Sequence, residues 1–511
     1  MTSVTSKSKW SRWVAAVAAG LQSLLVVVLF QNLGLAAGGS DSAPAQCQVH
    51  VVANEVVVSD RERRENAYHA LPAGVIPDPS QWPYFAWSDT QLGVVRTRDG
   101  SGYLFFGSDG GCHLNCSGKN SRGGSITVST GTLDQPLGEP LGDPNPPVHE
   151  FPIPNSSNLP DYMDYVGGGP VYRVPEGEPG AGGLLIVYHA ERPANVFWSW
   201  LGLAKSTDEG QTWQDLGLII SGTHPYNPQG QLDIGDGDLV VASDPATHRK
   251  YFYIYFGTDT TYLSVARAPY DELLRAIFMA DFAKMPAAGR FHKYYKGEWI
   301  SSGLDGPATE LFPAVTGQSD GDPQVKWSVY RKRFIAIEDN GQYIAYGESV
   351  DGLNWPPMQV VLGKNPQTAV YGYATPVGLG NDPAILGATF YVYYTAWPQG
   401  VSWQPATQNR LTVTTAASLK SIAPTSAVAG SAAFTLTVDG DRFVKRSKVL
   451  WNGSPRATSY VSATQLTAQI LASDIADASE VNVGVTNPDP CGGNSNTEPF
   501  TIYASGSPIS N

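Results

Sequence analysis

The sequence predicts an all-β protein in which a five-bladed β-propeller over residues 81–416 precedes a smaller β-sandwich over residues 419–504. Strand-like runs separated by Gly, Pro, Asp and Asn turns fill the first region, with almost no helical periodicity. After Leu419 the pattern changes to shorter alternating strands. The 54 Gly and 38 Pro among 511 residues fit many turns, and 42% hydrophobic with 15% charged residues is a globular composition.

The strands of the first region fall into five groups of roughly 65 residues each, a size compatible with propeller blades that carry loop insertions. Each group has an apolar, aromatic central strand and a following strand that ends in small or polar residues. The groups cover residues 92–130, 165–220, 238–269, 325–352 and 371–417. One segment departs from the pattern. Leu273, Ile277 and Phe278 stand at helical spacing in 271–284 and predict a short helix packed outside the third group.

A polar hairpin is encoded by Ser206, Asp208, Gly210, Thr212 and Trp213, in the spacing S-x-D-x-G-x-T-W. The Ser and Asp side chains can accept hydrogen bonds from N–H groups of their own turn, and the Gly can take a positive φ. The Trp can fold beneath the turn, so we expect it to be buried. The motif resembles the Asp-box of sialidases and predicts a stapled blade edge without a catalytic role. A shorter copy comprises Ser349, Asp351, Gly352 and Trp355.

The N-terminal segment 1–45 has the layout of a secretory signal, with Lys7, Lys9 and Arg12 before an apolar stretch over 13–37. Cleavage could follow Ala37 or Ala45. The alternative is an uncleaved signal anchor, because the apolar run is long enough to span a bilayer. Either interpretation predicts a secreted or cell-surface protein that meets a membrane only through such an anchor. Residues 46–80 are interpreted as a linker.

A formal charge of −13 and the lack of a long basic run argue against nucleic acid as a partner. Cys112 and Cys116 are close enough in sequence for a local disulfide, while Cys47 and Cys491 lie near the two ends, so more than one pairing stays open. A zinc site at Cys112, His113 and Cys116 is the alternative. It is disfavoured because no second pair of ligands stands nearby and the expected compartment is oxidising.

The C-terminal region resembles the IPT/TIG domain, an immunoglobulin-like module of many extracellular proteins. The resemblance covers residues 419–503 and rests on Ile422-x-Pro424, Gly430, LTVDGDRF, the WNG at Trp451, the QL at Gln465 and VTNPDP. It implies an immunoglobulin-like β-sandwich. Alternation of Phe434, Leu436 and Val438 with Thr residues independently indicates a half-buried strand.

The propeller region resembles five-bladed glycoside hydrolases, with most likeness to bacterial extracellular propellers associated with arabinan cleavage. The matching stretches are SDT at Ser88, FFGSDGG at Phe105, SRGGSITVST, WLGLAKSTDEGQTW, YLSVARAPYDELL, YYKGEWISSG, YATP and YYTAW. The family tends to have Gly-Asp-Thr where this chain has Gly107-Ser108-Asp109-Gly110. The resemblance implies a glycosidase acting on an arabinan-like or other neutral glycan, with acidic residues of the first blade important for cleavage.

Glycoside cleavage needs a protonated carboxyl beside the leaving oxygen and a carboxylate across the sugar. We expect Asp89 and Asp109 to meet at one end of the first hairpin as this pair, with Glu191 as a third catalytic candidate. Each could instead cap a turn or a loop. Candidate substrate-binding residues, which are acids near strand ends, aromatic residues and bases, are Asp164, Trp87, Arg122, His189, Asp322 and Trp397.

Two other functions stay open. A sialidase needs an arginine cluster, for which Arg96, Arg122 and Arg192 could be offered, but the early Arg-Ile-Pro pattern of sialidases is absent. A non-catalytic carbohydrate- or protein-binding propeller would retain glycan without cleaving it. Neither a serine-nucleophile elbow nor a zinc-protease motif is present. The glycosidase chemistry requires no cofactor, a structural calcium ion in the funnel stays open, and we expect a monomer.

Overall fold

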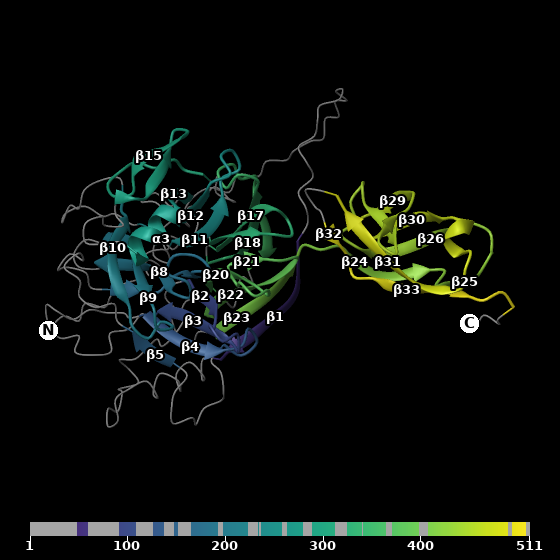
Figure 1. Ribbon diagram of the computed structural model, residues 1–511, viewed down its shortest axis with the longest axis horizontal. Coiled ribbons are helices and arrows are strands. Elements are labelled where there is room, and N and C mark those ends of the chain that lie inside the picture. The colour runs from purple at the N-terminus through teal and green to yellow at the C-terminus, as the bar shows by residue number, and fades with distance from the viewer. Residues whose placement is uncertain are drawn as a thin grey trace, which may run out of the picture.

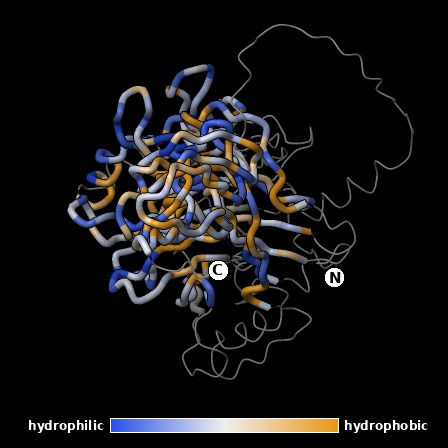
Figure 2. The backbone as a smooth tube through the Cα atoms, turned by 90° about the vertical axis from the view of Figure 1, so that its right-hand side faces the viewer, coloured by the Kyte–Doolittle hydropathy of each residue, from blue (hydrophilic) through white to orange (hydrophobic). Residues whose placement is uncertain are grey.

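The computed structural model describes residues 49–59, 91–108, 126–136, 148–151, 165–192, 198–222, 234, 237–257, 263–279, 289–311, 324–339, 341–363, 370–397, 407–488 and 493–506. Figure 1 shows two bodies, a propeller built from strands up to β23 and a sandwich built from later strands. In Figure 2 the hydrophobic segments gather inside the molecule and the hydrophilic ones form its outer loops.

The propeller strands form five sheets, and the fold is a five-bladed β-propeller as predicted. Blade one contains β2 (Gly93–Arg96), β3 (Tyr103–Ser108), β4 (Ile126–Gly131) and β5 (Val148–Phe151). Blade two contains β6 (Tyr165–Gly167), β7 (Val171–Arg173), β8 (Leu184–Arg192), β9 (Trp198–Ser206) and β10 (Gln214–Ile220). Blade three contains β11 (Asp238–Ser243), β12 (Lys250–Gly257), β13 (Leu263–Pro269), β14 (His292–Tyr295) and β15 (Glu298–Ser302).

Blade four contains β16 (Gln324–Ser328), β17 (Arg333–Asp339), β18 (Ile344–Ser349), β19 (Gln359–Leu362) and the short β21 (Ile385–Leu386). Blade five contains β20 (Val370–Gly378), β22 (Thr389–Trp397), β23 (Thr407–Thr414) and β1 (His50–Val58). Apolar clusters fill the seams between neighbouring blades, because the inner strands carry large side chains on both faces.

The assignment of residues 50–58 to a linker is corrected by strand β1, which pairs antiparallel with β23 along the outer edge of blade five. The chain therefore closes its ring with a strand from its beginning beside a strand from near residue 410. Buried Arg410 reinforces the closure with an ion pair to Glu55 at 2.6 Å and a second to Asp134 of blade one. Gln359 of blade four exchanges hydrogen bonds with the backbone of Val49.

The first polar hairpin forms the hydrogen bonds that its residue types predict. Ser206 Oγ accepts from the Gly210 N–H at 2.9 Å, and Asp208 accepts from the Thr212 N–H at 2.9 Å. Trp213 is buried, with 5% of its surface exposed, which confirms the expectation for this side chain. Its ring packs edge-on against Phe106 of blade one at 5.7 Å between centroids, so the turn fastens blade two to blade one.

The second polar turn repeats this arrangement between blade four and blade three. Ser349 Oγ accepts from the Gly352 N–H at 2.9 Å, and Asp351 accepts from the Asn354 N–H at 2.8 Å. Trp355 lies edge-on to Tyr255 of blade three, whose hydroxyl donates to the Gly352 carbonyl at 3.1 Å. Gly352 has φ 74°, and a Cβ there would meet the Tyr255 hydroxyl at 2.2 Å, so only glycine fits.

The single α-helix among the described residues is α3 (Tyr270–Phe278), shorter than the predicted 271–284, of which 280–284 lie outside the described residues. It begins after Pro269, with Asp271 and Glu272 in its first turn, as suits a helix N-terminus. Its apolar side chains enter the cluster shared by blades two and three. No helix of the described segments is long and apolar enough to cross a membrane.

The C-terminal body is a two-sheet sandwich with one core. One sheet contains β24 (Ser418–Ala423), β26 (Phe434–Asp441), β29 (Thr458–Ser462) and β30 (Gln465–Ile470). The other contains β25 (Ser426–Val428), β27 (Lys448–Trp451), β28 (Ser454–Pro455), β31 (Ser479–Asn487), β32 (Gly493–Asn494) and β33 (Glu498–Tyr503). A 3₁₀ turn, η3 (Ala472–Ile475), adds Ile475 to the core.

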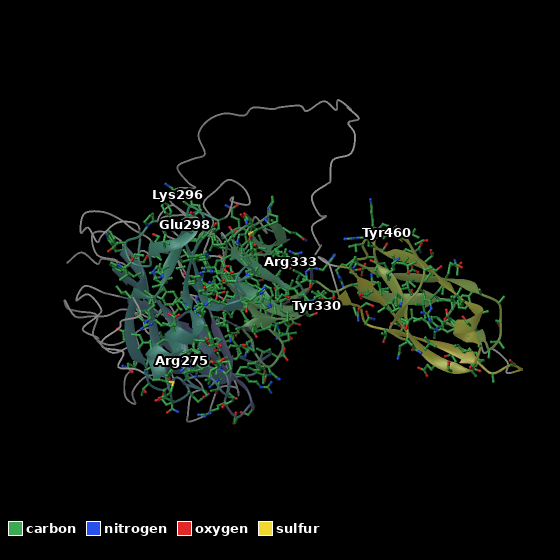
Figure 3. The ribbon with its side chains drawn as sticks, turned by 45° about the horizontal axis from the view of Figure 1, so that its top comes forward. Arg275, Lys296, Glu298, Tyr330, Arg333 and Tyr460 are labelled. Atoms are coloured by element: carbon green, nitrogen blue, oxygen red, sulfur yellow. The ribbon has the colours of Figure 1, made fainter. Side chains whose placement is uncertain are left out.

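The sandwich meets the propeller at the turn between β16 and β17. A Cβ on Gly493 would lie 1.9 Å from the ring of Tyr330, so the two groups are in close contact. Figure 3 shows Tyr330 and Arg333 on the side of the propeller nearest the sandwich. The Arg442 guanidinium lies near enough to oppose the rise that burial causes in the pKa of Tyr330.

Candidate functional site

Strand direction places particular residues at one end of the propeller. The innermost long strands are β2, β6, β11, β16 and β20, with the two-residue β21 on the inner side of β16. Each of the five pairs antiparallel with the next long strand of its blade. The beginning of an innermost strand therefore lies beside the end of its neighbour. Tyr165 stands opposite Glu191, Asp238 opposite Tyr255, and Val370 opposite Trp397.

Contacts between blades show that these strand beginnings meet around one ring. A Cβ on Gly93 of blade one would lie 2.4 Å from the Gly169 carbonyl oxygen of blade two. Likewise, a Cβ on Gly168 of blade two would lie 2.5 Å from the Gly107 carbonyl oxygen of blade one. On the other side of blade one, the Leu92 N–H donates to Thr375 Oγ1 of blade five at 3.0 Å. Small residues thus let the first two blades approach closely.

The other contacts complete the ring. A Cβ on Gly237 before β11 would lie 2.5 Å from the Leu201 side chain of blade two. Lys326 Nζ of blade four lies 2.5 Å from Asp238 Oδ1 of blade three. Asp339 Oδ2 of blade four accepts from the Ala374 N–H of blade five at 2.8 Å. We call this end of the propeller, where the innermost strands begin, the rim.

The ion pair at the rim is buried. Asp238 has no exposed surface, and its Oδ1 also accepts from the Leu239 N–H at 2.7 Å. Burial raises the pKa of Asp238, and the Lys326 ammonium and the Val325 N–H oppose that rise. A buried pair of this kind tolerates the loss of neither partner, because the remaining charge would stay desolvated. We therefore assign it to holding blades three and four in register.

At the opposite end of the propeller, the chain folds back against the inner strand of blade four. After β20 the segment 379–386 turns back and adds β21 parallel to β16, inside blade four. Asn381 Oδ1 accepts from Arg96 of blade one at 2.7 Å, so the segment bridges two inner strands. Asp382 in this turn has its pKa raised by burial, and Lys326 opposes the rise. Both polar hairpin turns also lie at this end, since they follow β9 and β18, which run in the same direction as the innermost strands.

The candidate residues predicted from sequence divide into two sets. Glu191 lies in β8 opposite the first residue of β6, which places its backbone at the rim. His189 and Trp397 are also at rim ends of strands, with 3% and 5% of their surfaces exposed, so they lie within blades and their substrate-binding role stays a prediction. Outside the described residues are Asp89, Asp109, Asp164, Asp322, Trp87, Arg122 and the cysteines Cys47, Cys112, Cys116 and Cys491.

The arginines offered for a sialidase are not brought together in the described residues. Arg96 ends β2, which runs away from the rim, whereas Arg192 ends β8, which runs toward it. Arg96 is also engaged by the Gly100 carbonyl and Asn381. Trp198 and Trp200 stack on one another in the core between blades one and two, so packing rather than sugar binding explains them.

Sequence reasoning missed the polar groups inside the rim: Gln324, Lys326, Asp238, Asp339 and Thr375. Each has at most 7% of its surface exposed. The sequence carries a weak sign of these groups. Gln324 and Lys326 stand at alternate positions of the otherwise largely apolar β16 and so share one face of the strand. Within the described ranges, no group of three or more His, Cys, Asp and Glu residues could hold a metal ion.

Comparisons with known proteins identify the C-terminal domain but assign no family to the propeller. Residues 417–502 match the IPT/TIG domain model. No curated protein matches the sequence. Two similar solved structures are a Dyadobacter fermentans protein of unknown function (12% identity, 72% of this chain and 96% of that chain, TM-score 0.37) and the catalytic domain of a Coprinopsis cinerea GH62 α-L-arabinofuranosidase (11%, 66% and 94%, 0.37). A third is an exo-β-1,3-galactanase from Clostridium thermocellum, with 12% identity, 84% of this chain and 87% of that chain covered, and a TM-score of 0.37. Nothing about the reaction follows from likenesses of this strength.

Proposed function

We propose that this protein is an extracellular glycoside hydrolase that cleaves a neutral, arabinan-like polysaccharide at the rim. The observation that carries the proposal is the ring of contacts at the rim, because it brings together strand ends from all five blades. Asp89 precedes β2 by a few residues, Asp109 directly follows β3, and Glu191 lies in β8. The ends of β2 and β3 beside these positions are paired, with Gly93 opposite Phe106.

The chemistry needs two carboxyl groups in different protonation states. One protonates the glycosidic oxygen as it leaves, and the other activates water or attacks the sugar from the opposite side. Carboxyls that approach one another have their pKa values pushed apart, which leaves one protonated and one charged near neutral pH. Asp238 and Asp339 are less suited to this work, since each already accepts a hydrogen bond that joins two blades.

The expected location follows from the N-terminal segment, whose basic start and apolar stretch favour export. The IPT/TIG domain that follows the propeller would then serve as a spacer outside the cell. We infer that the rim receives the polysaccharide.

The test is a hydrolysis screen on arabinan, galactan, arabinoxylan and a sialylated glycoprotein, using the chain from residue 46 onward. We expect release of neutral sugar, and a loss of at least about 100-fold in kcat for Asp89→Asn and Asp109→Asn. Release of sialic acid alone would replace the proposal by a sialidase. Retention of a glycan without any release would make the propeller a binding module.

A further inference from the structure

The chain passes from the propeller to the sandwich with almost no linker. Thr415, the residue after β23, is buried, and its N–H donates to the Ala388 carbonyl of blade five at 2.8 Å. Ala417, two residues further on, is also buried and belongs to the core of the sandwich. Only Ala416 therefore lies between a residue that is bonded to the propeller and a residue that is packed into the sandwich.

The connecting residue is held from the side of the sandwich. Arg442, which follows β26, donates a hydrogen bond from its Nε to the Ala416 carbonyl. A hydrogen bond from a charged guanidinium is stronger than one between neutral groups. The Arg442 carbonyl itself accepts from the buried Asn487 side chain at 2.8 Å. The sandwich therefore fixes both the backbone of this arginine and, through its side chain, the backbone at Ala416.

A second contact between the two bodies lies far from this connection in the sequence. Gly493 of β32 approaches Tyr330 of blade four so closely that a Cβ on the glycine would lie 1.9 Å from the tyrosine ring. Gly493 pairs with Asn487, the residue that also holds Arg442. The charge of Arg442 opposes the rise that burial causes in the pKa of Tyr330, so this guanidinium lies near the same ring. The two contacts are thus neighbours on the sandwich.

The propeller holds its own side of the junction through one short segment of blade five. The N–H of Val329, next to Tyr330, donates to the Leu386 carbonyl at 3.0 Å, and the N–H of Thr415 donates to the carbonyl of Ala388. Both contact points of the propeller are therefore tied to backbone only two residues apart. A sandwich held at two separate points cannot rotate freely about the single connecting residue.

Strand directions place this junction at the end of the propeller opposite the rim. Strand β23 runs in the same direction as β20, which begins at the rim, because both pair antiparallel with β22. The end of β23 at Thr414 is therefore away from the rim, as is Tyr330, which follows the end of β16. The first described strand also begins there, because His50 stands opposite Thr414. The sandwich thus leaves the rim free.

We propose that Tyr330, Ala416, Arg442 and Gly493 form an interaction surface within the chain that fixes the IPT/TIG sandwich rigidly to the end of the propeller opposite the rim. Domains of one chain move relative to one another by default, and a fixed arrangement needs specific contacts of this kind. The sandwich is then a rigid extension that holds the rim in one orientation, rather than a flexible spacer. This arrangement does not depend on which reaction, if any, the rim performs.

The test measures the distance between one label on each body, in the chain from residue 46 onward. Spin labels are attached at the exposed positions Lys296 of blade three and Tyr460 of the sandwich, through a non-natural amino acid that leaves the native cysteines unlabelled (Figure 3). Pulsed electron paramagnetic resonance gives the distribution of distances. We expect a narrow distribution in the otherwise wild-type chain. The variant Tyr330→Ala with Arg442→Ala should broaden it, because both contacts are removed.

Two control variants separate the junction from general effects of substitution. Tyr103→Ala with Arg275→Ala removes a half-buried tyrosine of blade one and an exposed arginine of α3, and should leave the distribution narrow. Tyr330→Phe keeps the ring and loses only a hydroxyl that has no hydrogen-bond partner in the described structure, so it should also stay narrow.

The outcomes either support or overturn the rigid junction. A broad distribution in the otherwise wild-type chain would make the sandwich a flexible spacer and overturn the proposal. A double variant that keeps its circular dichroism spectrum and stays narrow would show that these side chains do not fix the sandwich. If the double variant does not fold, Tyr330→Ala alone is compared with Tyr330→Phe, and equal widths would likewise overturn the proposal. The hydrolysis screen is decided separately, because the junction lies away from the rim.

Discussion

At the end of the propeller away from the rim, the two polar turns pair their own carboxylates with N–H groups of the same turn, through Asp208 and Asp351. At the rim, the buried side chains of Gln324 and Asp238 keep atoms that have no partner among the described residues. Both oxygens of each turn carboxylate are used within the turn, although the buried Trp213 Nε1 beneath the first turn has no partner among the described residues. The contrast between the two ends therefore lies in their carboxylates, since one oxygen of Asp238 at the rim stays unpaired. This difference teaches that a motif that is easily recognised in sequence, such as the two polar turns, can serve stability rather than ligand binding.

The largest effect is expected from the turn of blade two. Trp213→Ala removes a buried ring that packs against Phe106 of blade one, and should lower the free energy of unfolding by about 3 to 5 kcal/mol. Chemical denaturation measures the change. The comparison predicts that sugar binding at the rim survives below the melting point. Loss of binding at unchanged stability would mean that this end also contacts the ligand.

A comparable loss should follow from breaking the buried ion pair. Lys326→Met leaves the enclosed Asp238 carboxyl without its partner, which costs about 3 to 5 kcal/mol. The double variant Asp238→Leu with Lys326→Met removes both charges and should recover much of the stability. If the single and double variants unfold at the same denaturant concentration, the pair does not hold blades three and four together as described.

The ring closure should contribute less. Arg410→Met removes the ion pairs with Glu55 and Asp134, which are largely solvent-exposed, so we expect a loss of about 1 to 2 kcal/mol, mainly from the buried guanidinium's hydrogen bond to the Leu133 carbonyl. Hydrogen exchange should rise in residues 50–58 before it rises elsewhere. Uniform exchange across all blades would show that β1 does not close the ring.

The smallest effect concerns pH. Hydrogen bonds from Thr212 hold the pKa of Asp208 below its usual value against the opposing effect of burial. A carboxyl with a lowered folded-state pKa stabilises the fold above the unfolded value near 4, and that contribution is lost as the pH falls through the folded pKa. The Tm difference between wild type and Asp208→Asn should thus shrink below pH 4. Burial raises the pKa of Asp382, so its charged form costs stability at higher pH. Asp382→Asn should therefore raise Tm near neutral pH, and this gain should disappear as the pH falls below the folded-state pKa.

The blades could be predicted from sequence because each central strand is a continuous apolar run, as in β12 (KYFYIYFG), between turn residues. Strand β1 could not, although HVVANEVVV is rich in β-branched residues, because its partner β23 lies about 350 residues away and local pattern says nothing of such pairing. The short β21 could not be predicted either, because two residues carry no periodicity.

The candidate site was predictable only in outline. Acids next to strand ends suggested one mouth, and the register of β6 with β8 explains why Glu191 belongs there. The ion pair of Asp238 with Lys326 and the bond from Ala374 to Asp339 depend on contacts between blades, which no spacing in the sequence encodes. Asp89 and Asp109 lie outside the described residues and stay predictions.

The most direct test of the contrast between the two ends compares four carboxylates in one assay. Asp109→Asn and Glu191→Gln change the two catalytic candidates proposed for the rim, while Asp208→Asn and Asp351→Asn change the polar turns. With the polysaccharide identified by the screen, kcat and Tm are measured for each variant. The account predicts that the first pair loses at least about 100-fold in kcat at nearly wild-type Tm, and that the second pair melts earlier with wild-type kcat. Equal loss of kcat in both pairs, or full activity in the rim pair, would contradict it.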